Sequence, residues 1–200
     1  FRDRLELLLQ AGVELFQLRD KILDDRQLLS RARIMRKTID AFSSDKNQRP
    51  LMIINDRPDI AVLSSADGVH VGQEELPVAD TRAIVGPKQL IGVSTHSIDQ
   101  ARQAVLDGAD YIGCGPTFPT VTKSFSHYPG LEFLTEVGAE VSLPAFAIGG
   151  INRQRLPDVL ETGIERIAVS SALDQAENLV EETEQLLQQL DEAIDSADRA

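Results

Sequence analysis

Short apolar runs alternate along this chain with longer amphipathic segments, and this alternation limits the folds that the chain can adopt. The apolar runs are nearly continuous in valine, isoleucine, leucine and alanine, as buried parallel strands are. Strands that alternate with helices indicate an α/β fold, either a (βα)8 TIM barrel or an open doubly wound sheet. We expect strands at Val13–Leu18, Leu51–Ile54, Gly68–Val71, Leu90–Val93, Tyr111–Gly113, Ala145–Ile148 and Arg166–Val169.

The segments between the predicted strands carry residues that begin helices. Asp24 or Asp25 is expected to cap a helix that runs to about Phe42, because a short acidic side chain accepts the free N–H groups of a first helical turn. Ser97 and Gln100 have the spacing of a capping box, in which each side chain bonds the backbone N–H of the other residue.

The chain opens on a helical pattern instead of a strand. Leucines recur at helical spacing over residues 1–11, with no strand-like run before them. A barrel would then lack its first strand, so we expect that strand to lie upstream of Phe1 or to be absent from the chain. We predict a single barrel domain over residues 1–200, with its core in residues 1–173 and an acidic helix and tail in residues 174–200.

The balance of charge argues against two classes of partner. With 32 acidic and 20 basic side chains the formal net charge is −12, which repels both nucleic-acid phosphates and anionic lipid. No apolar run approaches the roughly 18 residues that a membrane helix needs. The single Cys114 cannot form an internal disulfide, which suits a reducing compartment. We therefore expect a cytoplasmic protein that binds neither nucleic acid nor membranes.

A cationic cluster follows the first predicted strand. Gln17, Arg19 and Lys21 occupy alternate positions, and alternate residues of an extended chain point the same way. A guanidinium and an ammonium together suit the oxygens of a phosphate group. The sequence therefore favours an anion site here. The alternative is that the two cations pair with Asp20 or Asp24 at the surface.

Two carboxylates stand just beyond the next two predicted strands. Asp56 and Glu75 would lie close together if those strands pair. Such carboxylates suit Mg²⁺, which keeps several waters and takes phosphate oxygens as further ligands. The alternative role for Asp56 is to cap the helix that begins at Pro58. His70, which stands between two valines, is more typical of a packed histidine than of a catalytic base.

Glycine- and hydroxyl-rich segments follow the later strands. The run Gly113–Lys123 ends in Thr-x-Thr-Lys and continues into Ser124–Gly130, and we expect this long loop to fold over a substrate, with a polar surface loop as the alternative. Ile148–Ile151 and Ser170–Ala172 follow the last two strands, where backbone amides form a common phosphate seat in barrels. Ser94, at the end of the fourth strand, is expected to donate its hydroxyl to phosphate.

These segments stand in the order and spacing of the thiamine phosphate synthase family, which the chain resembles from about Leu5 to Leu173. The matching motifs are Gln17–Lys21, Ile54–Arg57, Ala66–Gln73, Gly92–His96, Gly108–Gly113, Gly115–Lys123 and Ala147–Ile151. The resemblance implies a (βα)8 barrel and a transferase that joins hydroxymethylpyrimidine diphosphate to thiazole phosphate, with Mg²⁺ as cofactor. Its partners would be these two phosphorylated small molecules, and assembly into a homo-oligomer is left open.

The resemblance also assigns residues to the two substrates and the metal. The pyrimidine diphosphate would be held by Gln17, Arg19, Lys21, Asn55, Ser94 and Lys123. Among these residues Arg19, Lys21 and Lys123 would be the catalytic cations. The thiazole phosphate would be held by Thr120, Thr122, Gly150, Ser170 and Ser171. Magnesium would be held by Asp56 and Glu75, although the family usually has aspartate at the second position.

Two alternative functions stay open. A related thiazole tautomerase binds the same thiazole phosphate without making pyrophosphate, but that sister family generally lacks the Pro-Thr-x-Thr-Lys run at 119–123 and the Asn55–Asp56 pair. A noncatalytic sensor of phosphorylated ligands would keep the barrel and lose the reaction. Binding of each substrate alone, followed by pyrophosphate release with both, distinguishes the three functions.

Overall fold

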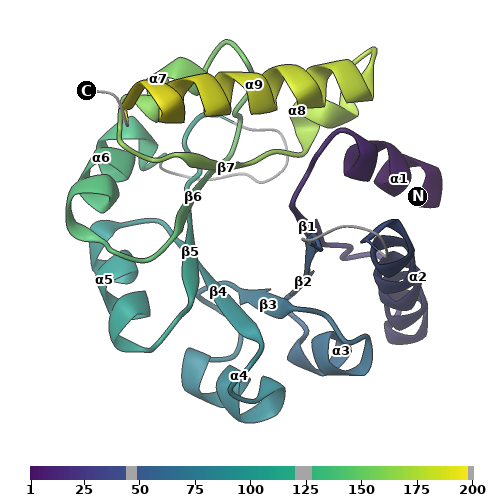
Figure 1. Cartoon of the computed structure of the whole chain (residues 1–200). Coiled ribbons are helices and arrows are strands. Elements are labelled where there is room, and N and C mark those ends of the chain that lie inside the picture. The colour runs from purple at the N-terminus through teal and green to yellow at the C-terminus, as the bar shows by residue number, and fades with distance from the viewer. Residues whose placement is uncertain (44–48, 120–127, 198–200) are drawn as a thin grey trace. The chain divides into compact units, whose positions relative to one another are not determined.

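The computed structural model of the chain describes residues 1–43, 49–119 and 128–197 (Figure 1). The backbone divides into two compact units, Phe1–Val93 (unit 1) and Ser94–Ala200 (unit 2). Strands alternate with helices in both units, as the pattern of apolar runs predicted. The single barrel domain over the whole chain stays a prediction.

Unit 1 is built on parallel strands that follow one another in chain order. The strands are β1 (Leu15–Leu18), β2 (Leu51–Asn55), β3 (Gly68–Val71) and β4 (Leu90–Thr95), whose last two residues belong to unit 2. Each strand pairs with the next, so that their carboxyl ends meet at one edge of the sheet. The register places Leu18 beside Ile54, and Asn55 beside His70.

The helices of unit 1 are α1 (Arg2–Gln10), α2 (Asp25–Ser43), α3 (Pro58–Leu63) and α4 (Val78–Val85). α2 packs on β2, and α3 packs on both β2 and β3 (Figure 1). Asp24 caps α2, because its Oδ1 accepts the backbone N–H of Gln27 at 2.8 Å and the Gln27 side chain accepts that of Asp24 at 3.3 Å. The predicted start of this helix is confirmed, with Asp24 as the cap.

Unit 2 repeats the same alternation. Its strands are β5 (Tyr111–Cys114), β6 (Ala145–Ile148) and β7 (Arg166–Ala168), which pair in parallel in that order. Its helices are α5 (Ile98–Leu106), α6 (Gly130–Glu140), α7 (Leu156–Leu160), α8 (Ser171–Asp174) and α9 (Leu179–Ala197). α6 packs on β6, and α9 packs on α7 and α8. None of the helices in the described ranges is both long and apolar enough to cross a bilayer.

Every predicted strand is present, and the predicted bounds of β3 and β6 are confirmed to the residue. β1 begins two residues later than expected, because the N–H of Val13 donates to Leu8 O at 3.1 Å and so belongs to the end of α1. The capping box at α5 is only half formed. Gln100 N–H bonds Ser97 Oγ at 3.3 Å, but Gln100 Oε1 accepts the N–H of His96 at 2.7 Å.

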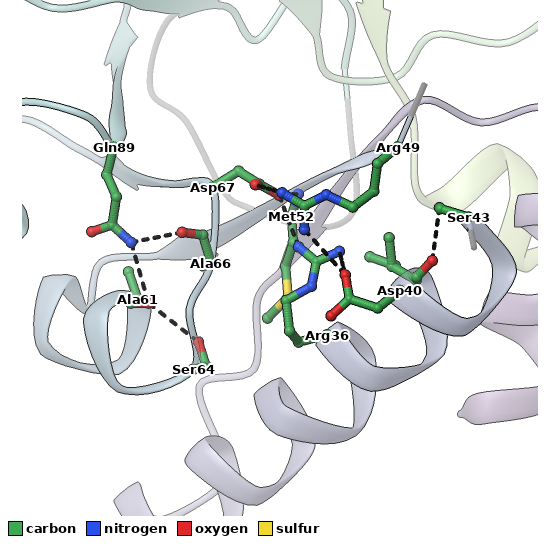
Figure 2. Close-up of polar contacts among 11 residues, drawn as sticks. Arg36, Asp40, Ser43, Arg49, Met52, Ala61, Ser64, Ala66, Asp67 and Gln89 are labelled. Atoms are coloured by element: carbon green, nitrogen blue, oxygen red, sulfur yellow. Dashed lines mark hydrogen bonds and ion pairs between the residues drawn. The ribbon is translucent and has the colours of Figure 1, made fainter. Parts of the chain in front are cut away.

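A buried ion pair fastens α2 to the amino ends of β2 and β3 (Figure 2). Nη1 of Arg36 lies 2.9 Å from Oδ2 of Asp67, and the same oxygen accepts the N–H of Met52 at 2.7 Å. Arg49 pairs with Asp67 and with Asp40 around this contact. These charges are structural, because they surround the start of the strands and not the ends where barrel chemistry is built.

A cavity of about 630 Å³ opens beside this ion-pair network and is lined in part by Arg36, Asp40 and Ser64. Because Arg36 binds Asp67, the residue just before β3, the cavity belongs to the amino ends of the strands. The predicted substrate residues of unit 1 stand at the opposite, carboxyl ends. The cavity is therefore separate from the candidate active site.

Candidate active site

The first group of predicted site residues lies at the carboxyl end of β1. Phe16 and Leu18 are buried, whereas Gln17 and Arg19 are exposed. This alternation is the one expected of an extended chain with one buried side. Gln17, Arg19 and Lys21 are therefore presented on the exposed side, as the spacing predicted.

Lys21 is paired with a residue of the neighbouring strand end. Its Nζ lies 3.4 Å from Oδ2 of Asp56, and the two side chains are 56% and 23% exposed. The two carboxylates predicted as alternative partners of the cations, Asp20 and Asp24, bind other groups. Asp20 binds Arg31 at 2.8 Å, and its Oδ1 accepts the backbone N–H groups that follow it, which lower the pKa of Asp20. Asp24 caps α2. The surface pairing of the cations with Asp20 or Asp24 is therefore wrong.

Asp56 has a backbone conformation that is rare for a residue with a side chain. Its φ is +61°, in the left-handed region where the Cβ crowds the backbone. Its N–H donates to His70 O at 2.8 Å, which anchors this turn to β3. The N-cap residue of α3 is Arg57, and its side chain makes no capping hydrogen bond. The alternative role of Asp56 as a helix cap is therefore wrong, and its carboxylate instead reaches Lys21.

Arg57 fastens the other side of the same turn. Its guanidinium binds Asp59 through Nε at 2.9 Å and Nη2 at 2.7 Å, and it binds Asp25 through Nη1. The two carboxylates raise the pKa of Arg57. Since Asp25 begins α2 and Asp59 lies in α3, this contact holds both helices against the turn that carries Asn55 and Asp56.

His70 lies beneath the turn and is 8% exposed. Burial lowers the pKa of its imidazole to about 4, and the nearby Asp56 opposes this shift by a smaller amount. The ring is therefore neutral near pH 7 and packed in the core. The expectation of a packed histidine is confirmed.

Glu75 follows β3 and folds back over the backbone. A Cβ at Gly72 would collide with its Oε2, so glycine leaves the room that this carboxylate occupies. Among the described residues no three histidine, cysteine or acidic side chains form a metal-binding group. Magnesium needs only one or two carboxylates besides water and phosphate. Asp56 and Glu75 follow the paired strands β2 and β3, and their donor chemistry therefore fits this ion.

In unit 2, the di-glycine turn after β6 is packed tightly against the loop after β5. The N–H groups of Thr117 and Phe118 donate to the carbonyls of Ile148 and Gly149 at 2.9 and 3.0 Å. The two glycines have φ of +100° and +66°, and a Cβ at Gly150 would lie 2.8 Å from Pro119 O. Only glycine fits this conformation and this close approach.

Three serines of unit 2, Ser94, Ser170 and Ser171, were also predicted to bind phosphate. Ser94 is half-buried and is the second-last residue of β4. Ser170 precedes α8, and its Oγ lies 3.2 Å from Asp174 Oδ2, while Ser171 is the first residue of that short helix. Thr120, Thr122 and Lys123 lie outside the described residues, so their roles stay predictions.

The structure thus brings together part of the predicted site in unit 1 and places one predicted residue of unit 2, Gly150, in a tightly packed turn. In unit 1 the carboxyl ends of β1 to β3 carry Gln17, Arg19, Lys21, Asn55, Asp56 and Glu75. In unit 2 the di-glycine turn meets the loop that holds Phe118. The sequence assigned no role to Arg57 or Arg155. The partners of Arg57 stand as far as 32 residues away, so no local pattern could reveal their meeting.

Comparison with known proteins identifies the family to which the chain belongs. The profile described as "Thiamine monophosphate synthase" matches residues 1–173. A protein of Rhodopirellula baltica named "Thiamine-phosphate synthase" is 53% identical over 177 residues, which cover 86% of this chain and 46% of the relative. One of the same name from a Nostoc species is 41% identical and is matched over 93% of this chain and 51% of its own length. The chain spans about half the length of these curated relatives.

A solved structure of a protein with a related name has the same fold. "Thiamine phosphate pyrophosphorylase" from Pyrococcus furiosus superposes with a TM-score of 0.85 and 33% identity, over 96% of this chain and 90% of that one. This likeness confirms the predicted TIM-barrel class, with seven parallel strands in the described residues. The motifs, the strand order and the three comparisons agree, and the chain belongs to the thiamine monophosphate synthase family.

Proposed function

We propose that the chain catalyses the synthesis of thiamine phosphate from hydroxymethylpyrimidine diphosphate and thiazole phosphate. The bond between the pyrimidine methylene carbon and the diphosphate oxygen breaks, and pyrophosphate leaves with the electron pair. The ring nitrogen of the thiazole supplies a new pair to the same carbon. We place this reaction in the cytoplasm, in keeping with the single, buried thiol of Cys114.

The observation that carries this proposal is the paired Lys21 and Asp56 beside the exposed Arg19. In a chain of net charge −12, cations gathered at strand ends attract an anionic substrate to that place. A diphosphate presents several oxygens at once, and guanidinium and ammonium groups bind such oxygens by charge-assisted hydrogen bonds. Family membership supports the same assignment.

The residues of unit 1 would bind and orient the diphosphate. Arg19 and Lys21 would neutralise negative charge that grows on the leaving pyrophosphate, which lowers the energy of the transition state. Gln17 and Asn55 would donate hydrogen bonds from their amides. Asp56 and Glu75 would hold Mg²⁺, whose positive charge, when bound, stabilises the same leaving group.

The residues of unit 2 would bind the second substrate. Gly150 and the serines Ser170 and Ser171 would hold the thiazole phosphate, together with Thr120 and Thr122. The nucleophile belongs to the substrate, so the chain needs neither a covalent residue nor an acid–base pair. Its task is to orient the two substrates and to shield the reacting carbon from water.

The test is a pyrophosphate-release assay with both substrates and Mg²⁺, beside calorimetry with each substrate alone. A synthase releases pyrophosphate only when both substrates are present. Binding without release would show a sensor, and binding of thiazole phosphate with no use of the diphosphate would show a tautomerase. Either result overturns the proposal.

A single variant probes the cation predicted on the loop after β5. Lys123→Ala should lose far more turnover than affinity for thiazole phosphate, because the lost charge acts on the leaving group. Lys88→Ala, which removes an exposed lysine just before β4, is the matched control. Near-normal pyrophosphate release by Lys123→Ala would refute the role of this residue.

A further inference from the structure

We infer that Arg155 is a positioning residue, which holds the peptide of Gly150 and the ring of Phe118 so that the thiazole phosphate seat is formed before substrate arrives. The inference rests on the proposed function and adds to it a residue outside the predicted site. All the contacts that carry it lie within unit 2.

Arg155 touches both segments of the seat at once. Its Nη1 donates to Gly150 O at 2.7 Å, and its Cζ lies 5.0 Å from the centroid of the Phe118 ring. Phe118 N–H in turn donates to Gly149 O at 3.0 Å. One side chain therefore closes a small cycle of contacts between the di-glycine turn and the loop after β5.

The backbone holds Arg155 firmly in this place. Its N–H lies 3.1 Å from both the carbonyl oxygen and the Oδ1 of Asn152, in the turn just before α7. A side chain on a fixed backbone binds without the further loss of backbone freedom that one on a free loop would incur. The turn that begins at Asn152 thus fixes the backbone of Arg155, and Arg155 in turn holds the peptide of Gly150.

The bond to Gly150 O determines where the next amide points. Because a trans peptide is planar, the N–H of Ile151 points away from the carbonyl that Arg155 holds. Within the described ranges, no residue accepts the N–H of Gly150 or of Ile151. Successive N–H groups without partners, in a turn of left-handed glycines, form an anion-binding concavity. Arg155 therefore fixes the orientation of amides that are available to a phosphate.

The stack on Phe118 extends this effect to the predicted substrate loop. Phe118 stands two residues before Thr120 and four before Thr122, the threonines predicted to bind thiazole phosphate. A cation over an aromatic ring contributes a modest attraction, so the stack restrains the Phe118 ring without locking it. Arg155 acts on substrate through Gly150 and Phe118, which makes it a positioning residue and not a catalytic one.

The experiment measures steady-state constants for Arg155→Ala. Loss of a charge-assisted hydrogen bond should raise KM for thiazole phosphate about tenfold. The kcat and the KM for the pyrimidine diphosphate should stay within about twofold, because the leaving-group residues are unchanged. Arg153→Ala is the matched control, since Arg153 lies on the same segment but binds Glu182 at 2.9 Å. Equal changes in both KM values, or none, would overturn the inference.

Two further variants and a binding measurement keep the inference testable if Arg155→Ala is unstable. Arg155→Lys keeps the charge but loses the planar group, and Phe118→Leu removes the ring. Both should raise KM for thiazole phosphate by less than Arg155→Ala does.

Calorimetry with thiazole phosphate alone separates this inference from the proposed function. A wild type that releases no pyrophosphate, yet binds thiazole phosphate more tightly than the Arg155 variants, would overturn the function and support the positioning role. Equal binding by wild type and variants would overturn the positioning role.

Discussion

Lys21 Nζ lies 3.4 Å from Asp56 Oδ2 and joins the carboxyl ends of two neighbouring strands. The contact places one cation and one carboxylate together while Arg19 stays exposed on the same strand end. The left-handed turn at Asp56 brings its carboxylate to this position. Under the proposed function, this backbone geometry would prepare the place for both an anionic substrate and a metal cation before either arrives.

Asp56→Asn should abolish most of the activity and leave the fold intact. Asparagine tolerates the left-handed conformation at least as well as aspartate, so the turn is kept while the charge is lost. We expect kcat for pyrophosphate release to fall about a hundredfold, with a higher Mg²⁺ requirement. Asp80→Asn, at an exposed position of α4, is the control and should behave as wild type. Wild-type turnover in Asp56→Asn would remove Asp56 from the proposed metal site.

Asp67→Ala should destabilise the protein strongly. The side chains of Arg36 and Asp67 are only 9% and 13% exposed, so the substitution leaves a buried guanidinium with the more exposed Asp40 as its remaining acidic partner. We expect the free energy of unfolding to fall by about 3 kcal/mol in urea titrations. Arg2→Ala breaks the exposed pair with Glu6 and should cost less than about 0.5 kcal/mol. Similar losses in the two variants would contradict a structural role for the buried pair.

Gly150→Ala should cost more stability than Gly130→Ala, although both glycines have left-handed φ, +66° and +71°. A Cβ at Gly130 meets nothing within 4 Å, so only the backbone strain of about 1 kcal/mol is expected. A Cβ at Gly150 would lie 2.8 Å from Pro119 O, which adds about 1–3 kcal/mol. Thermal unfolding of the two variants measures the difference, and equal losses would show that the close approach is unimportant.

His70 should make stability depend on pH between about 4 and 6.5. Burial lowers the pKa of this imidazole from 6.5 to about 4, so in this range the unfolded chain binds a proton that the folded protein does not. The free energy of unfolding therefore falls as pH drops from 6.5 to 4, by at most about 3 kcal/mol from this group. His70→Gln should lose this part of the slope when unfolding is followed without added Mg²⁺. An unchanged slope would mean that the imidazole is protonated in the folded state.

The strands could be predicted because their signal is local. Parallel strands buried on both sides need nearly continuous apolar runs, and Gly68–Val71 and Tyr111–Cys114 satisfy that need without reference to the rest of the chain. Polar residues at the ends of such runs, such as Arg19 and Asp56, are then placed by the rule that barrel chemistry lies at carboxyl ends. The family resemblance rests on the same local motifs.

The pairing of side chains was decided only by the tertiary structure. Whether Lys21 binds Asp20, Asp24 or Asp56 depends on strand register and on which carboxylates are already taken by Arg31 and by the cap of α2. The contacts of Arg155 with Gly150 and Phe118 likewise need two loops to meet. Sequence by itself determines which segments become buried and where polar groups gather, because burial and periodicity are local. Partner choice follows from packing between distant segments, and only the folded chain specifies it.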